Sequence, residues 1–414
     1  MPFSEELLAI SGKAEQDLAP IFAERDRISQ VLTEKVLKAF RDNRVSDTCF
    51  GITTGYGYDD RGREVLDRVW AQVFGTEAAL VRHNFVNGSH TISTALFGLL
   101  RPGDTLLSVA GKPYDTLDQV IGIGGANGDG SLADFGVSYD QIDLCDGRLD
   151  VRAIAERVRN DKTVKVVFIQ RSKGYLARRT LTPGEITEAT RAVHAAREGV
   201  YVVVDNCYGE FTCECEPEAD LICGSLIKNP GGGMALTGGY LAGTEKAITL
   251  ASYRLTTVGT GGEVGATLGQ NRNMFMGLFY APHTTSQAIK TAHFAAYVFS
   301  KLGYDVLPVW DEPRADIIQT VTTGSPEKLC AFCRGVQAGS PVDSYVEPQP
   351  WAMPGYSDEV IMAAGCFVQG ASVELSADGP LRAPYTVFFQ GGLTYESGKY
   401  GILTAAEAVG KNKQ

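Results

Sequence analysis

A short apolar run that ends in a lysine has the clearest chemical consequence in this sequence. The run Ser225-Leu-Ile leads into Lys228, and Asn-Pro and three glycines follow as far as Gly233. A lysine at the end of a buried strand loses contact with water, and this burial lowers its pKa and favours the neutral amine, which attacks aldehydes. The glycines let the backbone approach a bulky ligand closely. The alternative interpretation is a surface lysine before a flexible loop.

A second apolar run, upstream of Lys228, ends in an acid. Val202-Val-Val precedes Asp205, so a strand is predicted whose last residue places a carboxylate at the carboxyl edge of a sheet. Open α/β sheets bind ligands at this edge. A carboxylate there can pair with a protonated nitrogen in the ring of a cofactor and so keep the ring electron-poor. By itself Asp205 is more simply a turn or capping residue. Together with a nucleophilic lysine, it favours a shared site.

A third candidate is an anion site at the start of a predicted helix. Asn87-Gly-Ser-His90 precedes an amphipathic stretch that starts at Thr91. Free backbone N–H groups at a helix N-terminus, together with a serine hydroxyl, suit a phosphate. An ordinary capping turn is the alternative. The residues that would hold the anion are Gly88, Ser89 and His90.

A fourth candidate is the tyrosine of Lys112-Pro-Tyr114, in a loop that follows a predicted strand. A tyrosine in such a loop can stack on a flat aromatic ligand. The alternative is a tyrosine that belongs to the core or the surface.

The elements that position these residues follow from an alternation of short apolar runs and amphipathic stretches. The predicted strands are 79–81, 105–109, 165–169, 200–204 and 220–225, and the predicted helices between them are 91–100, 150–160 and 184–198. Such alternation predicts βαβ units and a mostly parallel sheet, in the α/β class. Helical spacing also covers the first forty residues and about 270–302, while 50–62 is predicted to be a loop. We expect a helical segment over 1–50, a large domain over 51–300 and a small domain over 301–414.

Composition narrows the class of protein. The 414 residues carry a formal net charge of −11, which makes the chain a poor partner for nucleic acid or an anionic membrane. Its apolar runs are too short to span a bilayer, and its first residues lack the basic and apolar regions of a signal peptide. Nine scattered cysteines fit reduced thiols better than a disulfide framework. We expect a cytoplasmic protein that acts on a small molecule.

Three longer motifs connect these residues to a known family. They are Gly55-Tyr-Gly-Tyr-Asp-Asp-Arg-Gly-Arg63, the run from Ser225 to Gly233, and Leu375-Ser-Ala-Asp-Gly-Pro-Leu-Arg-Ala-Pro-Tyr385. Over nearly its whole length the chain resembles the methionine gamma-lyase-related family, often labelled aluminium-resistance or cystathionine beta-lyase-like proteins. The resemblance implies the aspartate aminotransferase-like fold of fold-type I enzymes, with a large, mostly parallel-sheet domain and a smaller C-terminal α/β domain. It also implies pyridoxal 5'-phosphate as cofactor and carbon–sulfur lyase activity, by β- or γ-elimination, on a sulfur-containing or similar amino acid.

The resemblance also implies a role for each candidate residue. Lys228 would form the Schiff base with the cofactor, Asp205 would pair with its ring nitrogen, and Tyr114 would stack on the ring. Arg382 would bind the α-carboxylate of the substrate in a bidentate pair, although a surface arginine is the alternative. The cofactor's phosphate would lie against Gly88, Ser89, His90 and Ser225.

In related lyases a tyrosine and an arginine of a neighbouring subunit also reach the phosphate. The candidates here are Tyr56, Tyr58, Arg61 and Arg63, and Tyr56 and Arg63 are favoured. A shared site of this kind requires a homo-oligomer, either a dimer or a tetramer. Tyr114 or Tyr56 would then be the acid that protonates the leaving thiol.

The chain departs from well-studied gamma-lyases at two places. Ile227 stands where they have threonine, and Gln170-Arg-Ser stands where they have Asn-Pro. The contact to the cofactor's phenolic oxygen would therefore pass to Arg171 or Ser172. These departures leave the substrate and the broken bond open, and an aminotransferase or a non-catalytic protein with the same fold are the alternatives.

Two other classes of site lack their motifs. Gly259-Thr-Gly-Gly-Glu-Val264 misses the final glycine of a dinucleotide fingerprint and follows no clear strand, which argues against a nicotinamide enzyme. Cys330-Ala-Phe-Cys333 has no second pair at zinc-ligand spacing, so we expect no metal.

Overall fold

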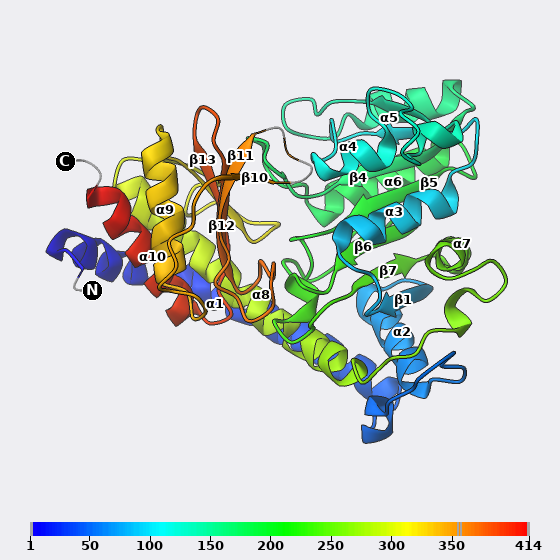
Figure 1. The fold of residues 1–414 in the computed structure, drawn as a ribbon, viewed down its shortest axis with the longest axis horizontal. Helices are drawn as coiled ribbons and strands as arrows, with labels where there is room; N and C mark the ends of the chain where they lie inside the picture. Colours follow the sequence, from blue (N-terminus) through cyan, green and yellow to red (C-terminus); the bar gives the residue numbers. More distant parts are fainter. Residues whose placement is uncertain (1–2, 354–355, 357, 412–414) are drawn as a thin grey trace.

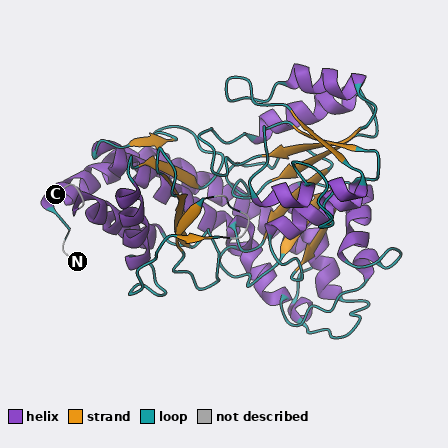
Figure 2. Ribbon diagram, turned by 45° about the horizontal axis from the view of Figure 1, so that its top comes forward, coloured by secondary structure: helices purple, strands orange, loops and turns teal. Residues whose placement is uncertain are grey.

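The computed structural model describes residues 3–353, 356 and 358–411. These residues form two lobes, one around a seven-stranded sheet and the other around a six-stranded sheet (Figure 1). Figure 2, turned by 45°, shows the same two sheets apart from each other with helices around them. Two long helices, α1 (Glu5–Asp42) and α8 (Asn271–Lys301), run along both lobes.

The larger sheet supplies the strand ends at which the candidate residues lie. Its order is β1-β7-β6-β5-β4-β2-β3; the strands from β3 to β6 are parallel, and β7 is antiparallel to both of its neighbours. The mostly parallel sheet of the predicted α/β fold is therefore confirmed. The strands are β1 (Ala78–Arg82), β2 (Thr105–Ser108), β3 (Ser138–Gln141), β4 (Val164–Gln170), β5 (Tyr201–Asp205), β6 (Leu221–Ser225) and β7 (Gly239–Gly243).

Helices cover both faces of this sheet, which explains why its central strands are continuously apolar. Along β4, Val166 and Phe168 belong to one core, while Val167 and Ile169 belong to another. A strand buried on both faces carries apolar residues without alternation. The first core includes α3 (Gly88–Leu99), and the second includes α5 (Val151–Asn160) and α6 (Pro183–Ala196). The large lobe also contains α2 (Arg61–Phe74), α4 (Thr116–Ile121) and α7 (Glu245–Leu255).

The smaller sheet is antiparallel throughout, in the order β10-β11-β12-β13-β9-β8. Along β12, Leu375 and Ala377 face a core shared with α9 (Pro326–Ala338) and α10 (Tyr395–Lys411). Because side chains alternate along a strand, Ser376 and Asp378 face the other way, toward the large lobe. The strands are β8 (Asp305–Leu307), β9 (Ile318–Thr322), β10 (Trp351–Ala352), β11 (Glu359–Ala363), β12 (Leu375–Pro380) and β13 (Thr386–Gly391).

Helices α1 and α8 tie the lobes together, since each contributes to both cores. Leu18 of α1 lies in the core of the small lobe and Leu32 in a core of the large lobe. In α8, Phe275 lies in the same core of the large lobe as Leu32, and Phe299 lies in the core of the small lobe. The domain boundaries near residues 50 and 300 therefore stay predictions. None of the helices in the described part of the chain is both long and apolar enough to cross a membrane.

Candidate active site

A cavity of about 350 Å³ lies between the carboxyl ends of the parallel strands and one face of the smaller sheet. The structure thus brings together most of the residues that were singled out in the sequence, although they come from distant segments. Those that line the cavity are Gly88, Ser89, Tyr114, Ser172, Asp205, Ser225, Lys228 and Arg382. The others, which do not line it in this chain, are Tyr56, Tyr58, Arg63, His90 and Arg171.

Lys228 follows β6, and its ammonium lies over the ring of Tyr208, with Nζ 3.8 Å from the ring centroid. Burial by itself lowers the pKa of Lys228, but the acidic groups of Cys207, Tyr208 and Asp205 outweigh burial and raise the pKa well above the ordinary lysine value. The lowered pKa expected from burial alone is therefore wrong, because acidic side chains surround this lysine. A protonated Lys228 gives the cavity floor a positive charge that suits an anionic ligand.

Asp205 is the last residue of β5, the strand next to β6 in the sheet, and only 6% of its surface is exposed. Its Oδ1 accepts a hydrogen bond from the backbone N–H of Cys207 at 3.1 Å. Burial raises the pKa of Asp205, and the charge of Lys228 opposes this rise. The acid and the lysine thus enter one cavity from adjacent strands.

The N-terminus of α3 forms the part of the wall where an anion was predicted. Gly88 fits closely there, since a Cβ added to it would lie 3.3 Å from the Sγ of Cys207 and 3.5 Å from the Cβ of Ser225. Asn87 caps the helix and accepts a hydrogen bond from the backbone N–H of His90 at 2.9 Å. That N–H is already used, and His90 does not line the cavity.

Tyr114 is anchored at both ends. Its hydroxyl hydrogen-bonds with the Oγ of Ser89, and its backbone N–H donates to the side chain of Gln170 at 2.8 Å. Burial, and after it the charge of Asp205, raises the pKa of Tyr114 to about 12. The phenol therefore keeps its proton at neutral pH and can act as a proton donor.

Tyr208 is a cavity residue that the sequence analysis missed. It lies in the turn after Asp205 with a positive φ of 72°, a backbone conformation that residues other than glycine rarely adopt. This backbone carries its ring under the ammonium of Lys228. The one available signal was its place in the turn directly after a functional strand end.

The wall opposite the large sheet contains a buried acid, Asp378, which was also missed. It accepts hydrogen bonds from the hydroxyl of Tyr175 and, at 3.2 Å, from Nε2 of Gln390. Burial raises its pKa to about 6. The ring of Tyr175 packs on that of Phe388, with centroids 4.9 Å apart. The available signal was the polar alternation Ser-Ala-Asp inside the motif that begins at Leu375.

Arg382 lies at the edge of the cavity, where its side chain is 44% exposed. Its Nη1 is 3.0 Å from Oδ2 of Asp358. The guanidinium is thus held in place and still has donors available for a ligand. Its role as the carboxylate ligand stays a prediction.

The loop before α2 does not line this chain's own cavity. Tyr56 and Tyr58 are 76% and 58% exposed, and their rings stack with centroids 5.7 Å apart. Arg63, by contrast, is buried and holds the loop in place. The expected contact of Arg63 with the cofactor's phosphate in a neighbouring subunit therefore does not fit. The exposed arginine of this loop region is Arg61. The guanidinium of Arg63 donates to the backbone carbonyls of Gly57, Glu263 and Gly265.

The position expected for Arg171 also needs correction. Side chains alternate at the end of β4, so Gln170 and Ser172 line the cavity while Arg171 points to the other side. There its Nη1 lies 3.2 Å from Oε2 of Glu216, and the side chain is fully buried. Of the two residues proposed to contact the phenolic oxygen, only Ser172 lines the cavity.

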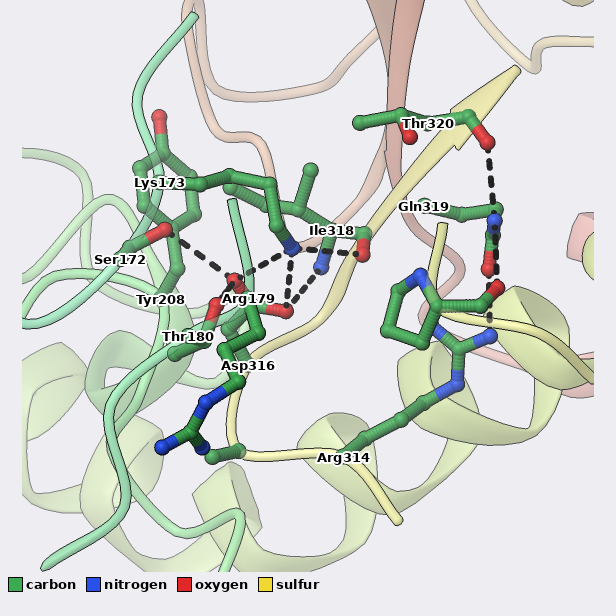
Figure 3. A network of polar contacts seen from close by, with 12 residues as sticks. Ser172, Lys173, Arg179, Thr180, Tyr208, Arg314, Asp316, Ile318, Gln319 and Thr320 are labelled. Atoms are coloured by element: carbon green, nitrogen blue, oxygen red, sulfur yellow. Dashed lines mark hydrogen bonds and ion pairs between the residues drawn. The ribbon is translucent and has the colours of Figure 1, made fainter. Parts of the chain in front are cut away.

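A buried polar network adjoins the cavity, which its residues Ser172 and Lys173 line (Figure 3). Nζ of Lys173 lies 3.1 Å from Oδ2 of Asp316, and both side chains are almost fully buried. Ser172 donates to the same carboxylate at 3.2 Å, and the hydroxyl of Thr180 donates to it as well. Burial would raise the pKa of Asp316, but Lys173 and the other donors outweigh burial and lower it. The network joins the loop after β4 to the segment before β9.

Comparison with known proteins decides the family. The family model described as methionine gamma-lyase matches residues 7–410. The chain belongs to the methionine gamma-lyase family. The uncharacterized protein YnbB of Bacillus subtilis is 50% identical over 409 residues, which cover 98% of this chain and 97% of YnbB.

Solved structures agree with this membership of the methionine gamma-lyase family. A carbon–sulfur lyase involved in aluminium resistance from Clostridium novyi NT is 47% identical, with a TM-score of 0.94 over 98% of this chain and 96% of that one. The pyridoxal-5'-phosphate-dependent protein YhfS from Escherichia coli is 16% identical, with a TM-score of 0.60 over 93% of this chain and 96% of that one, and shows the fold alone. The family resemblance and the fold-type I architecture expected from the motifs are confirmed.

Proposed function

We propose that this protein is a pyridoxal-phosphate-dependent carbon–sulfur lyase that acts on a sulfur-containing amino acid by β- or γ-elimination. One observation carries the proposal: Lys228 and Asp205 enter the same cavity from adjacent strands, and the N-terminus of α3 lies in its wall. Membership of the methionine gamma-lyase family and the likeness to the Clostridium novyi carbon–sulfur lyase support the reaction class.

The residues present fit pyridoxal phosphate. The amine of Lys228 suits its aldehyde, the buried Asp205 suits its protonated ring nitrogen, and a helix N-terminus flanked by the hydroxyls of Ser89 and Ser225 suits its phosphate. When bound, the cofactor supplies an electron-accepting ring that stabilises negative charge at the α-carbon of an amino acid.

The chain's own side chains would then transfer protons and orient the substrate. Nζ of Lys228 is the group placed to take the proton from Cα and, for γ-elimination, to move a second proton from Cβ. Arg382 would hold the α-carboxylate at the cavity edge. The phenol of Tyr114, which stays protonated because its pKa is raised to about 12, would protonate the leaving sulfur. Tyr56 of a neighbouring subunit is the alternative acid.

The first experiment tests the cofactor and its lysine. The purified protein, supplied with pyridoxal phosphate, should show the visible absorption band of a lysine-bound cofactor, and Lys228→Ala should lack it. Lys165→Ala is the matched control, because this lysine lies on β4 with its Nζ on an exposed carbonyl. A wild-type protein without the band, or a Lys228→Ala variant that keeps it, would refute the assignment.

A product assay tests the reaction. A lyase should convert a sulfur amino acid to a thiol, ammonia and a keto acid without any second keto acid. Turnover that depends on added keto acid, with no thiol released, would instead indicate an aminotransferase.

The proposed enzyme is a homo-oligomer whose subunits share active sites, since the exposed loop of Tyr56 and Tyr58 is not used by its own cavity. Its location in the cytoplasm, expected from the cysteine content, stays a prediction.

A further inference from the structure

Polar side chains from the smaller sheet and the turn before β12 form a patch in the cavity wall that the proposed reaction does not use. This polar patch consists of Ser372, Ser376, Asp378 and Gln390. Each of its side chains belongs to a residue that is at most 7% exposed. Strand register assembles it, because Ser376 of β12 pairs with Gln390 of β13 and Asp378 follows two residues along the same face of β12.

Three polar atoms of the patch are buried without a hydrogen-bond partner among the described residues. They are Oγ of Ser372, Oγ of Ser376 and Oε1 of Gln390. Buried polar atoms of folded proteins nearly always have a partner, so an unpartnered one indicates a ligand or an ordered water. All three residues line the same cavity as Asp378, so this part of its wall has hydrogen-bonding capacity that the described chain does not use.

The hydrogen bonds of Asp378 show which kind of group fits. Its carboxylate accepts from the hydroxyl of Tyr175 and from Nε2 of Gln390. Since the amide nitrogen of Gln390 faces the carboxylate, its Oε1 is the atom left over, and this oxygen can only accept. The patch therefore offers a negative charge, an amide oxygen and two hydroxyls. This set suits a positively charged donor and repels a carboxylate.

We propose that the polar patch binds an ammonium group at the leaving-group end of the substrate. The proposal rests on the lyase function above, in which Lys228 and Arg382 serve the α-amino and α-carboxylate ends. It names a substrate class: thioether amino acids whose departing thiol carries a primary amine.

Two synthetic substrates isolate this interaction because they differ only at the far end. S-(2-aminoethyl)cysteine ends in an ammonium group, and S-propylcysteine ends in a methyl group of similar size. β-Elimination with one water converts each to pyruvate, ammonia and the free thiol. We expect kcat/KM to favour the first by about 10- to 100-fold, which is the effect of a hydrogen bond to a charged group.

Variants show whether the preference comes from the patch. Asp378→Asn should bring the ratio of the two kcat/KM values close to one, and Ser376→Ala should lower it by a smaller factor. Glu359→Gln is the matched control, since this glutamate lies exposed on the neighbouring strand β11 and does not line the cavity. If Asp378 had only a structural role, Asp378→Asn would lower both kcat/KM values alike and preserve the ratio. That result, or a wild-type ratio near one, would overturn the proposal.

Binding provides a readout that does not require turnover. In Lys228→Ala with added pyridoxal phosphate, calorimetric titration should give a lower Kd for S-(2-aminoethyl)cysteine than for S-propylcysteine, by a similar factor. The difference should disappear in the double variant Lys228→Ala/Asp378→Asn. If the wild type eliminates neither compound but the binding difference persists, the lyase function fails and the patch proposal stands. Equal binding of the two compounds overturns the patch proposal itself.

Discussion

Asp378 is the residue whose charge decides how the cavity treats a cationic ligand. Burial raises its pKa to about 6, while the hydroxyl of Tyr175, the charge of Lys228 and the amide of Gln390 oppose this rise. Other ionisable groups lie near it: one on α9 behind the sheet, one in the turn after β5 and one in the segment before β11. All of them have raised pKa values and are neutral near pH 6; they are Cys333, Tyr208 and Tyr356. Asp378 is thus the group of this wall that changes charge in the mildly acidic range.

We therefore expect the preference for S-(2-aminoethyl)cysteine over S-propylcysteine to fall as the pH drops through about 6. Above this pKa, Asp378 is a carboxylate that attracts ammonium; below it, Asp378 is a neutral acid. The titrations of the α-amino and α-carboxyl groups cancel in the ratio, and a side-chain ammonium keeps its proton below a pKa of about 10. Steady-state kinetics on both substrates would measure the profile. Asp378→Asn should give a flat, low ratio, and a flat wild-type ratio would contradict the role of Asp378.

At this scale, the sequence identifies residues that stand at the ends of apolar runs and misses those placed by register. Asp205 was found because it ends β5, and Lys228 because it ends the apolar run that continues two residues beyond β6; the end of an apolar run is a local signal. Arg171 was misplaced because the side to which a strand end points depends on the phase of side-chain alternation. Asp378 and Gln390 were missed because they meet only through the pairing of β12 with β13, which no local pattern specifies.

At the scale of the elements, one buried ion pair connects the loop after β4 to the segment before β9. Lys173 and Asp316 are almost fully buried, and Thr180 and Ser172 complete the hydrogen bonds of the carboxylate. Removing one partner of such a pair leaves an uncompensated charge inside the protein. The pair therefore links the two lobes beside the cavity (Figure 3).

We expect Lys173→Met to lower the free energy of unfolding by about 3–5 kcal/mol, because Asp316 would stay buried without its cation. Urea denaturation would measure the change. Lys173→Met/Asp316→Asn should recover part of the loss, since the unpaired charge is gone. Arg191→Met is the control: Arg191 and Glu218 form an ion pair with side chains 69% and 62% exposed, and such pairs are worth at most about 1 kcal/mol. An equal effect of Lys173→Met and Arg191→Met would show that the buried pair contributes nothing special.

The elements themselves were predictable where periodicity is strong. Strands β1, β2, β4, β5 and β6 and helices α1, α3, α5, α6 and α8 all lie close to their predicted ranges. Strand β7 was missed because Gly239-Tyr-Leu-Ala-Gly243 is short and starts and ends in glycine. It forms a strand because β1 and β6 pair with it on both sides. Helix α2 was not predicted; it begins at Arg61, inside the predicted loop 50–62, where Asp60 caps it.

At the scale of the whole molecule, the loop of Tyr56 and Tyr58 is the surface on which the proposed sharing of active sites rests. Both tyrosines are exposed and do not line their own cavity. The loop is nevertheless held firmly, because Arg63 donates to the carbonyls of Gly57 and Gly265. Exposed, stacked aromatic residues on a braced loop are typical of a contact surface. A second copy of the chain is the partner that the proposed shared active site requires.

Mixed oligomers test this sharing directly. We expect Lys228→Ala to be inactive. If Tyr56, the alternative to Tyr114, is the acid, Tyr56→Phe should lose at least about 100-fold in kcat. In a two-fold symmetric dimer of one subunit of each kind, one site would combine both defects, and the other would receive Lys228 from one chain and Tyr56 from the other. Subunits unfolded together and refolded as a mixture should therefore regain about a quarter of the wild-type activity, because half of the randomly formed dimers are hybrids with one intact site. If Tyr56 acts in the active site of its own chain, every site in every hybrid keeps one defect, and the mixture stays inactive. A fully active Tyr56→Phe variant would show that Tyr56 takes no part in the reaction.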